Sequence, residues 1–186
     1  MIASLDTRTA PAERLKGHYV RFLDALRACG FEGEIAPDYA NRTVLATDNS
    51  IYQRLPQAAV FPKHAEDLER LAKLAAELPH REVVLTPRGG GTGTNGQSLT
   101  DGIVVDVSRH MNQILEIDVE ARQVRVQAGV VKDQLNAALK PHGLFFAPEL
   151  STSNRATIGG MVSTDASGQG SCEYGKTRHH VLALDT

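Results

Sequence analysis

The sequence predicts an α+β fold, because helical and strand-like segments follow one another without the regular alternation of a βαβ series. Two strongly periodic helices are expected at residues 14–28 and 64–78, with a short strand between them. From residue 82 to residue 128 the pattern changes to several strand-like segments. The chain has 186 residues, of which 41% are hydrophobic, which is enough for one domain with a core, or one domain with an appended segment.

The N-terminal third is expected to contain both long helices. In residues 14–28 the large apolar side chains fall on one helical face, and Gly30 can end the helix. Residues 31–56 show little periodicity and are expected to form a loop-rich entry segment. Residues 58–61 are a short apolar run that Pro62 ends, which predicts a strand. The helix that follows has an apolar stripe made of Leu68, Leu71, Ala75 and Leu78.

The middle of the chain is expected to supply most of the strands. Residues 82–86 and 103–107 are apolar runs typical of buried strands. Residues 114–118 and 123–128 form a further pair, and the second of these alternates between apolar and polar residues, so one of its faces should be wet. A short helix is expected at residues 133–140.

The last third of the chain has a different composition. Residues 145–175 are rich in serine, threonine, glycine and asparagine, so they should make a poor core but a suitable ligand-lining segment. His179 and His180 are candidates for acid–base chemistry, although a structural pair at a strand edge is the simpler interpretation. The sequence stops at residues 182–186, inside an apolar run typical of a strand, which favours a portion of a longer protein.

Charge and targeting signals exclude several classes of protein. The net charge is −2, whereas a dedicated nucleic-acid-binding protein would carry a clear basic excess. No apolar run approaches the roughly 18–20 residues that span a bilayer, and residues 1–14 lack the core of a signal peptide. A cytoplasmic location is expected, with peripheral attachment to the inner membrane left open. Cys29 and Cys172 match no metal or disulfide pattern and are expected to be reduced thiols.

The glycine-rich segment at residues 87–96 is the most informative about function. From Gly91 to Gly96 its letters match the Rossmann pattern GxGxxG. A Rossmann loop must open a helix, and residues 97–102 leave no room for one before the next expected strand. A helix directly after Gly96 would favour an NAD-type dehydrogenase, whereas a strand that pairs back to the one before the loop would argue against it.

A diphosphate is the ligand that this segment suits best. A P-loop is excluded because the segment lacks the Gly-Lys-Ser/Thr sequence. Glycines let the backbone approach a ligand closely, and consecutive N–H groups can then form an anion-binding nest. Thr92, Thr94 and Asn95 add short polar side chains, and Arg88 adds a positive charge. The alternative is a flexible turn that binds nothing, which would not need so many glycines.

A second segment has the same character. Residues 156–161 and 165–170 again combine glycines with hydroxyl-bearing residues. Two such segments can line opposite sides of one long ligand, and a dinucleotide has that shape.

With these features the sequence resembles the FAD-binding domain of the vanillyl-alcohol oxidase / p-cresol methylhydroxylase type. The resemblance runs from about residue 55 to the C-terminus. It is closest to large bacterial FAD-linked dehydrogenases of D-2-hydroxy acids, of the D-lactate and D-2-hydroxyglutarate type, which carry a C-terminal iron–sulfur segment. The motifs, in family order, are Val60-Phe-Pro62, residues 87–92, Val105-Asp-Val-Ser108 with Asn112, Ala128-Gly129, Pro148, residues 156–160 and Ala166-Ser-Gly168.

The resemblance implies two small α+β subdomains, the second of them incomplete in this chain. Residues 1–54 would be a helical and loop segment, and residues 55–186 the FAD-binding domain, truncated at its C-terminal end. FAD would be bound non-covalently, because Thr92 stands where some family members attach FAD through a histidine. The implied FAD-binding residues are Arg88, Gly89, Gly90, Gly91, Thr92, Gly93, Thr94 and Asn95 for the pyrophosphate, Pro148, Ser151, Thr157, Gly159 and Gly160 for the ribityl and isoalloxazine side, and Thr164 and Gly168 near the flavin or the adenosine phosphate.

The activity that the resemblance implies is the oxidation of a D-2-hydroxy acid by hydride transfer to FAD, with a quinone, a cytochrome or an electron-transfer protein as electron acceptor. No catalytic residue and no metal ligand is assigned in this chain. The acid–base and substrate-binding groups, and a 4Fe-4S cluster, would lie beyond Thr186, so the chain alone is expected to be inactive and to bind FAD weakly at most. Oxidases of sugar lactones or alcohols in the same family, or a non-catalytic fragment, are the alternatives. The oligomeric state is left open.

Overall fold

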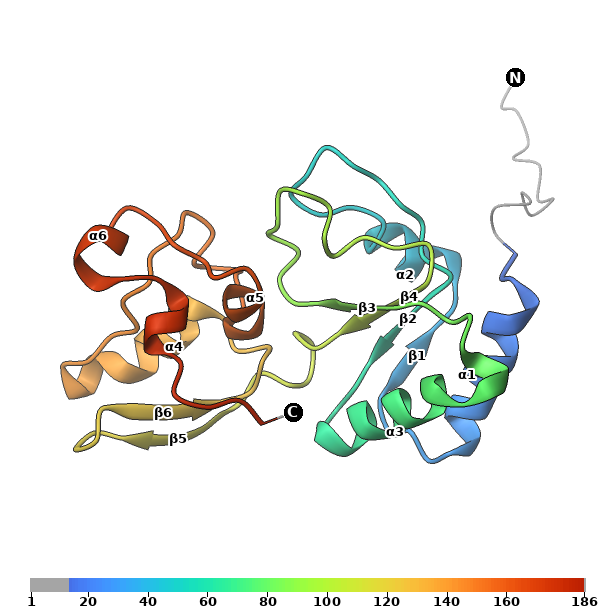
Figure 1. The fold of residues 1–186 in the computed structure, drawn as a ribbon, viewed down its shortest axis with the longest axis horizontal. Helices are drawn as coiled ribbons and strands as arrows, with labels where there is room; N and C mark the ends of the chain where they lie inside the picture. Colours follow the sequence, from blue (N-terminus) through green and yellow to red (C-terminus); the bar gives the residue numbers. More distant parts are fainter. Residues whose placement is uncertain (1–13, 186) are drawn as a thin grey trace, which may run out of the picture.

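The computed structural model describes residues 14–185 of the chain. Two parts lie side by side (Figure 1). The first part contains a four-stranded sheet with helices on it, and the second contains a two-stranded sheet, short helices and long irregular segments. The predicted α+β fold with two small subdomains is therefore confirmed. Among the described residues, no helix has the length and apolar character that crossing a bilayer requires.

The sheet of the first part combines one antiparallel and two parallel strand pairs. β1 (Glu34–Ala36) runs antiparallel to β2 (Ala58–Phe61), whereas β2 and β3 (Leu85–Arg88) both run parallel to β4 (Ile103–Asp106). β3 is an edge strand, which explains why it tolerates Pro87. It lies further along the chain than predicted, because Val83 donates its N–H to the carbonyl of His80 in a preceding turn. The strand order is β1-β2-β4-β3.

Helices α1 (Gly17–Ala28) and α3 (Ala65–Ala76) cover one face of this sheet (Figure 1). The predicted apolar faces of both helices are correct except at Leu78, which is 77% exposed because α3 ends at Ala76 and Leu78 falls in a 3-10 turn, Leu78–His80. The core between helices and sheet is made of Tyr19, Phe22, Leu23, Leu26, Phe31, Leu71 and Leu74 with Ala58, Val60, Ile103 and Val105 from the strands.

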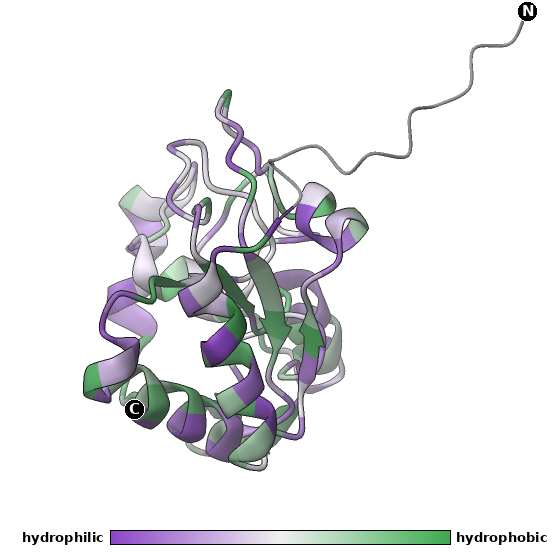
Figure 2. Cartoon of the chain, turned by 90° about the vertical axis from the view of Figure 1, so that its right-hand side faces the viewer, coloured by the Kyte–Doolittle hydropathy of each residue, from purple (hydrophilic) through white to green (hydrophobic). Residues whose placement is uncertain are grey.

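The other face of the sheet is covered by a smaller cluster near helix α2 (Tyr39–Val44). Ala59, Phe61 and Val104 belong to this cluster, so the central strands are buried on both sides. In Figure 2 the strands of the sheet are largely green, the colour of hydrophobic residues. The expectation of a loop-rich segment at residues 31–56 is thus wrong in part, since β1 and α2 form there. Both elements are too short to give a periodic pattern.

The N-terminal elements belong to the same layers as the rest of the first part. β1 pairs with β2, and α1 packs against α3. The division of the chain between residues 54 and 55 stays a prediction; across that position the polypeptide shares one sheet and one core.

The second part is built on a hairpin of β5 (Ile114–Asp118) and β6 (Gln123–Val126), followed by α4 (Lys132–Leu139), α5 (Ile158–Ser163) and α6 (Ser171–Tyr174). Val130, Leu135 and Leu139 make its buried core, against the inner face of the hairpin. The strand expected at residues 182–186 does not form in residues 182–185, and Thr186 lies outside the described residues. This end of the chain is tied to the hairpin by an ion pair of 2.6 Å between Arg125 and Asp185.

Candidate cofactor site

A groove of about 820 Å³ lies between the two parts of the chain. Its first wall is the end of β3 and the glycine loop, residues 89–95. Its second wall is formed by α5 and the residues on either side of it. Val107 and Ala128, from the segments that lead into and out of the hairpin, line it between these walls. The groove has the size typical of small-molecule sites.

The glycine loop connects two parallel neighbouring strands, β3 and β4. Such a connection usually contains a helix. Here residues 89–102 contain none, and β4 pairs back directly to β3. The NAD-type Rossmann interpretation is therefore wrong, and the expected strand–loop–strand connection is confirmed.

The backbone N–H groups of residues 89–94 indicate which kind of ligand the loop can bind. Within residues 14–185 no group accepts a hydrogen bond from any of these N–H groups, although most of the loop is partly buried. Gly91 has φ 62°, in the left-handed region that favours glycine. Buried N–H groups need partners, and a run of them in a glycine loop is an anion-binding arrangement.

The second wall offers a different chemistry. The N–H groups of Ile158 and Gly159 already donate to the carbonyls of Val130 and Ala128. The Thr164 hydroxyl donates to the carbonyl of Gly160 at 2.9 Å, and the Ser163 hydroxyl bonds in the same way one residue earlier. This wall therefore presents hydroxyl oxygens and the flat surface of small residues, whereas unsatisfied donors lie on the glycine loop.

The two walls touch at the base of the groove. A Cβ on Gly89 would overlap the hydroxyl of Thr157, and a Cβ on Gly90 would overlap the carbonyl oxygen of Arg155. Thr157 is 1% exposed and accepts a hydrogen bond from the N–H of Gly160 at 3.3 Å. Glycine at positions 89 and 90 is thus required for the approach of the two walls.

The charge in the groove comes from Arg88. Its Nη2 donates to the carbonyl of Thr47 at 2.8 Å, and burial lowers the pKa of its guanidinium while the carboxylates of Asp106 and Asp48 oppose that shift. An arginine stays charged at neutral pH. Among the described residues that line the groove there is no carboxylate, no histidine and no lysine. Arg88 is thus the one charged residue among the described residues that line the groove, and these residues include no acid–base pair.

The structure brings most of the sequence-predicted residues into this one groove. All of them line it except Pro148, Ser151 and Gly168. Pro148 is buried beneath the second wall, Ser151 is exposed away from it, and Gly168 packs its backbone against the carbonyl of Glu149. Their neighbours line the groove instead: Leu150, Thr152 and Ser167.

Several lining residues were not predicted from the sequence. Gln97 and Ser98 follow the glycine loop directly, so their position in the sequence was the signal that could have found them. Val107 and Ala128 also line the groove, yet an apolar or small residue there looks like any other core residue in a sequence.

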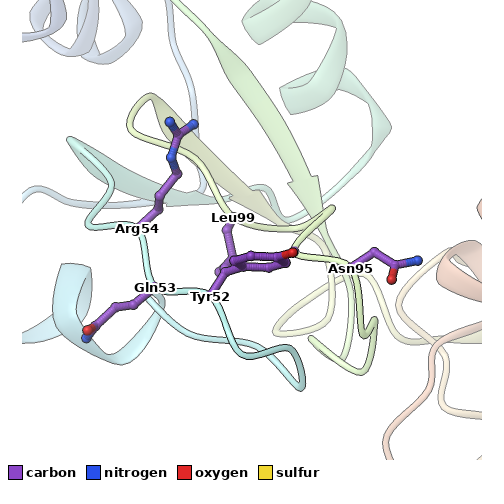
Figure 3. A pocket seen from close by; sticks show the side chains of 6 residues that line it. Tyr52, Gln53, Arg54, Asn95 and Leu99 are labelled. Carbon is purple, nitrogen blue, oxygen red and sulfur yellow. The ribbon is translucent and has the colours of Figure 1, made fainter.

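A smaller pocket of about 280 Å³ lies behind the glycine loop. Figure 3 shows the Tyr52 ring against Leu99, while the side chains of Gln53, Arg54 and Asn95 point in different directions. Because its polar groups do not converge, this pocket has no recognisable binding chemistry.

The other candidate residues lie outside the groove. His179 and His180 belong to a 3-10 turn, Thr177–His180, so the expected strand-edge position is wrong. His179 accepts a hydrogen bond from the N–H of Lys176 at 3.0 Å, and His180 lies 2.8 Å from the carbonyl of Tyr174, so both have structural partners. Cys29 and Cys172 are free and exposed. The part of the chain that the structure describes holds no group of three or more potential metal ligands.

The chain is highly similar in sequence to a known protein. A D-2-hydroxyglutarate dehydrogenase of Pseudomonas putida is 74% identical over 184 residues, which are 99% of this chain but 18% of that protein. The chain thus spans about a fifth of the length of that relative.

Solved structures share the fold at low sequence identity. An alkyldihydroxyacetonephosphate synthase matches with a TM-score of 0.77 at 24% identity, over 94% of this chain and 34% of the other. A p-cresol methylhydroxylase matches with a TM-score of 0.64 at 16% identity, over 81% of this chain and 30% of the other. The profile of one family, described as "FAD binding domain", matches residues 56–186. The chain belongs to the FAD binding domain family, and its fold is the p-cresol methylhydroxylase type.

Proposed function

We propose that the glycine loop holds the diphosphate of FAD and that the chain is the FAD-binding part of a dehydrogenase that oxidises a D-2-hydroxy acid. The observation that carries the first half is the run of N–H groups at residues 89–94 that have no acceptor among the described residues, in a loop that follows Arg88 and lines the groove. Diphosphate oxygens would satisfy these donors without any side chain being ionised. The absence of carboxylates in the lining of the described groove avoids repulsion.

The roles of the remaining groove residues follow from the two walls. Thr92, Thr94 and Asn95 would add side-chain contacts at the loop. Thr157, Gly159, Gly160 and Thr164 would line the flavin side, where small residues leave room for a flat ring. Pro148, Ser151 and Gly168 would act through their neighbours, since they do not line the groove in this structure.

The substrate class rests on sequence similarity. The relative at 74% identity is a D-2-hydroxyglutarate dehydrogenase, which makes D-2-hydroxyglutarate the first substrate to test and D-lactate the second. A bound flavin would accept the hydride from C2 of the hydroxy acid, so that a 2-oxo acid is formed. This chain's residues would bind and orient the flavin. Because the described residues that line the groove include no carboxylate, histidine or lysine, the hydroxyl proton would go to a base elsewhere.

The partners follow from the same reaction. Electrons from the reduced flavin would pass to a quinone, a cytochrome or an electron-transfer protein, and a 4Fe-4S cluster would belong to polypeptide outside this chain. A cytoplasmic location, with peripheral contact to the inner membrane, is part of the same proposal. An oxidase of a sugar lactone or an alcohol is the second candidate function.

The cofactor proposal is tested on the chain itself by NMR, which also detects weak binding. The ¹⁵N-labelled protein is titrated with FAD, ADP, inorganic diphosphate, adenosine and riboflavin. We expect the three diphosphate-bearing ligands to shift the amide signals of residues 89–94, and adenosine and riboflavin to leave them unchanged. Shifts confined to other residues would show that the loop does not hold the diphosphate.

The substrate proposal needs the longest polypeptide encoded by the reading frame that contains this chain. Its visible spectrum should show a bound flavin. Dye-linked oxidation is then measured over D- and L-2-hydroxy acids, a sugar lactone and a primary alcohol. Preference for an L-acid, a lactone or an alcohol would refute the assignment to D-2-hydroxy acids but would leave the FAD assignment untouched.

A further inference from the structure

The outer side of the glycine loop is covered by residues 46–54, which we call the strap. The strap precedes the part of the chain that matches the FAD binding domain family, residues 56–186. It folds back on itself, because the N–H of Arg54 donates to the carbonyl of Ala46 at 2.9 Å and Thr47 pairs with Gln53. It therefore lies on the glycine loop as a closed turn.

Three hydrogen bonds join the strap to the loop and its two ends. Arg88, at the start of the loop, donates to the carbonyl of Thr47. In the middle, the carbonyl of Gly91 accepts from the N–H of Asn49 at 3.0 Å. At the far end, the hydroxyl of Ser98 donates to Oδ2 of Asp48 at 3.1 Å. The strap thus contacts the loop at its start, its middle and its end.

Asp48 is the residue on which these contacts depend. Its second oxygen, Oδ1, accepts from the N–H of Ser50 at 2.8 Å, which shapes the turn that presents Asn49. Its charge also acts on the guanidinium of Arg88. Ser98, its partner at the far end of the loop, is 8% exposed and lines the groove. One carboxylate therefore links the turn of the strap, the arginine before the loop and the serine after it.

The strap also holds one carbonyl of the loop in place. The carbonyl of Gly91 is directed outward to Asn49, while the neighbouring N–H groups remain without partners. On the same outer side, the Tyr52 ring lies against Leu99 (Figure 3), and a Cβ on Gly96 would lie 3.0 Å from that ring. A loop this rich in glycine has many other conformations, and most of them would not align the N–H groups.

We propose that Asp48 is a positioning residue for the diphosphate-binding loop, acting through Ser98 and through the turn that carries Asn49. Asp48 is not among the residues that line the groove. This inference rests on the proposed function of the loop, and it adds that the binding machinery begins before residue 56, where the family match starts.

Geometry and charge make opposite predictions for the loss of this carboxylate. Removal of a negative charge beside an anion site should strengthen anion binding by Coulomb's law. If Asp48 positions the loop, Asp48→Ala should instead weaken binding, because the loop must be ordered at the moment of binding. The sign of the change in ADP affinity therefore distinguishes a positioning role of Asp48 from a purely electrostatic effect of its charge.

The test measures ADP affinity from the amide shifts of residues 89–94 in the ¹⁵N-labelled chain, and the urea midpoint of each variant. We expect Asp48→Ala to weaken ADP about tenfold, the scale of a lost hydrogen bond to a charged group. Ser98→Ala should weaken it by a smaller factor, and Asp48→Asn, which keeps one acceptor oxygen, should retain most of the affinity. The double variant should be no weaker than Asp48→Ala, since Asp48→Ala already removes the contact with Ser98.

The matched control is Asp101→Ala. Asp101 is exposed, lies close to Ser98 in the sequence, and makes no side-chain hydrogen bond within the described residues. Its loss changes the net charge equally, so ADP affinity should stay at the wild-type value or rise slightly.

The outcomes are distinguishable. Unchanged or tighter ADP binding by Asp48→Ala, with the wild type shifting at residues 89–94, would overturn the positioning role and leave the loop's function standing. If the wild type itself shows no shift there, the proposed function fails, and the inference with it. If Asp48→Ala does not fold, Ser98→Ala decides, because it deletes only the hydroxyl: unchanged affinity in a folded Ser98→Ala would overturn the proposal.

Discussion

Gly90 and Arg155 lie so close together that any side chain at position 90 would overlap the carbonyl oxygen of Arg155. The two residues belong to opposite walls of the groove, one on the glycine loop and one just before α5. A neighbouring contact, between Gly89 and Thr157, is equally close. The distance between the walls is therefore set by two close contacts of glycine backbone, one with a carbonyl oxygen and one with a buried side chain, which leaves little freedom to adjust.

Gly90→Ala should push the two walls apart. We expect the free energy of unfolding to fall by about 1–3 kcal/mol, the usual cost of overpacking, and the diphosphate affinity of the loop to fall at least tenfold. Urea denaturation and the ADP titration measure the two effects. Gly17→Ala is the control, because a Cβ there meets only the end of Arg21 at 3.6 Å. If Gly90→Ala bound ADP as tightly as the wild type does, diphosphate binding would not depend on the close approach of the two walls, and the prediction would be wrong.

The sequence predicted the sheet and the long helices because their signals are local. The apolar face of α1 and the apolar runs at residues 58–61 of β2 and 103–105 of β4 require no knowledge of the rest of the chain. Elements of three to six residues, such as β1 and α2, carry no usable period, and they form because the sheet and its core stabilise them. Buried Arg42 is a similar case, since its Nε donates to the carbonyl of Pro56 at 2.7 Å and only the tertiary structure brings the two together.

The candidate site was predictable where its residues share a loop. Residues 88–95 form one wall by themselves, so composition and flanking strands sufficed to find them. Pro148 was placed at the groove but is buried, because in an irregular segment the sequence does not tell which neighbour faces the groove. The proposed positioning role of Asp48 could not be predicted from the sequence, because it depends on a contact with Ser98, which is 50 residues away in the chain.

Thr157→Val should destabilise the second wall without filling the groove. Valine has nearly the same shape but cannot accept the hydrogen bond from the N–H of Gly160, so the cap of α5 is lost. The expected loss is about 1 kcal/mol of the free energy of unfolding, as for other N-caps. Thr157→Ser keeps the hydroxyl and should lose less than valine does. Urea denaturation of the three proteins checks this, and equal stability of wild type and valine variant would contradict the cap.

FAD should be released from the protein by acid. Thr92 lines the groove at the position where some family members attach FAD through a histidine. A threonine cannot form that histidine–flavin bond, so the cofactor is expected to be bound non-covalently. Precipitation of the flavin-loaded polypeptide with trichloroacetic acid should leave all of the yellow colour in the supernatant. Flavin fluorescence that stays with the denatured protein on a gel would show a covalent bond and would contradict this prediction.

Asp67 should make the stability of the first part depend on pH. It is fully buried on α3, and its carboxylate accepts hydrogen bonds from the N–H groups of Glu32 (2.9 Å) and Lys63 (3.0 Å) and from Arg70 (3.2 Å). Burial raises the pKa of Asp67, but these hydrogen bonds and the nearby charges outweigh burial, so its pKa lies below the ordinary value. The carboxylate thus ties the segments before β1 and after β2 to the helix.

The sign of the pH effect follows from that lowered pKa. An aspartate with a depressed folded-state pKa contributes its full stability above the unfolded-state pKa, about 3.9, and loses it as the pH falls through the folded-state pKa. Asp67→Asn should therefore cost about 2 kcal/mol at pH 7. The difference from wild type should shrink as urea denaturation is repeated from about pH 4 downward. Glu69→Gln is the control on the same helix, because its pair with Lys73 is exposed and should matter little at any pH. A difference between wild type and Asp67→Asn that stays constant down to the acid transition would mean that the charge of Asp67 does not stabilise the fold.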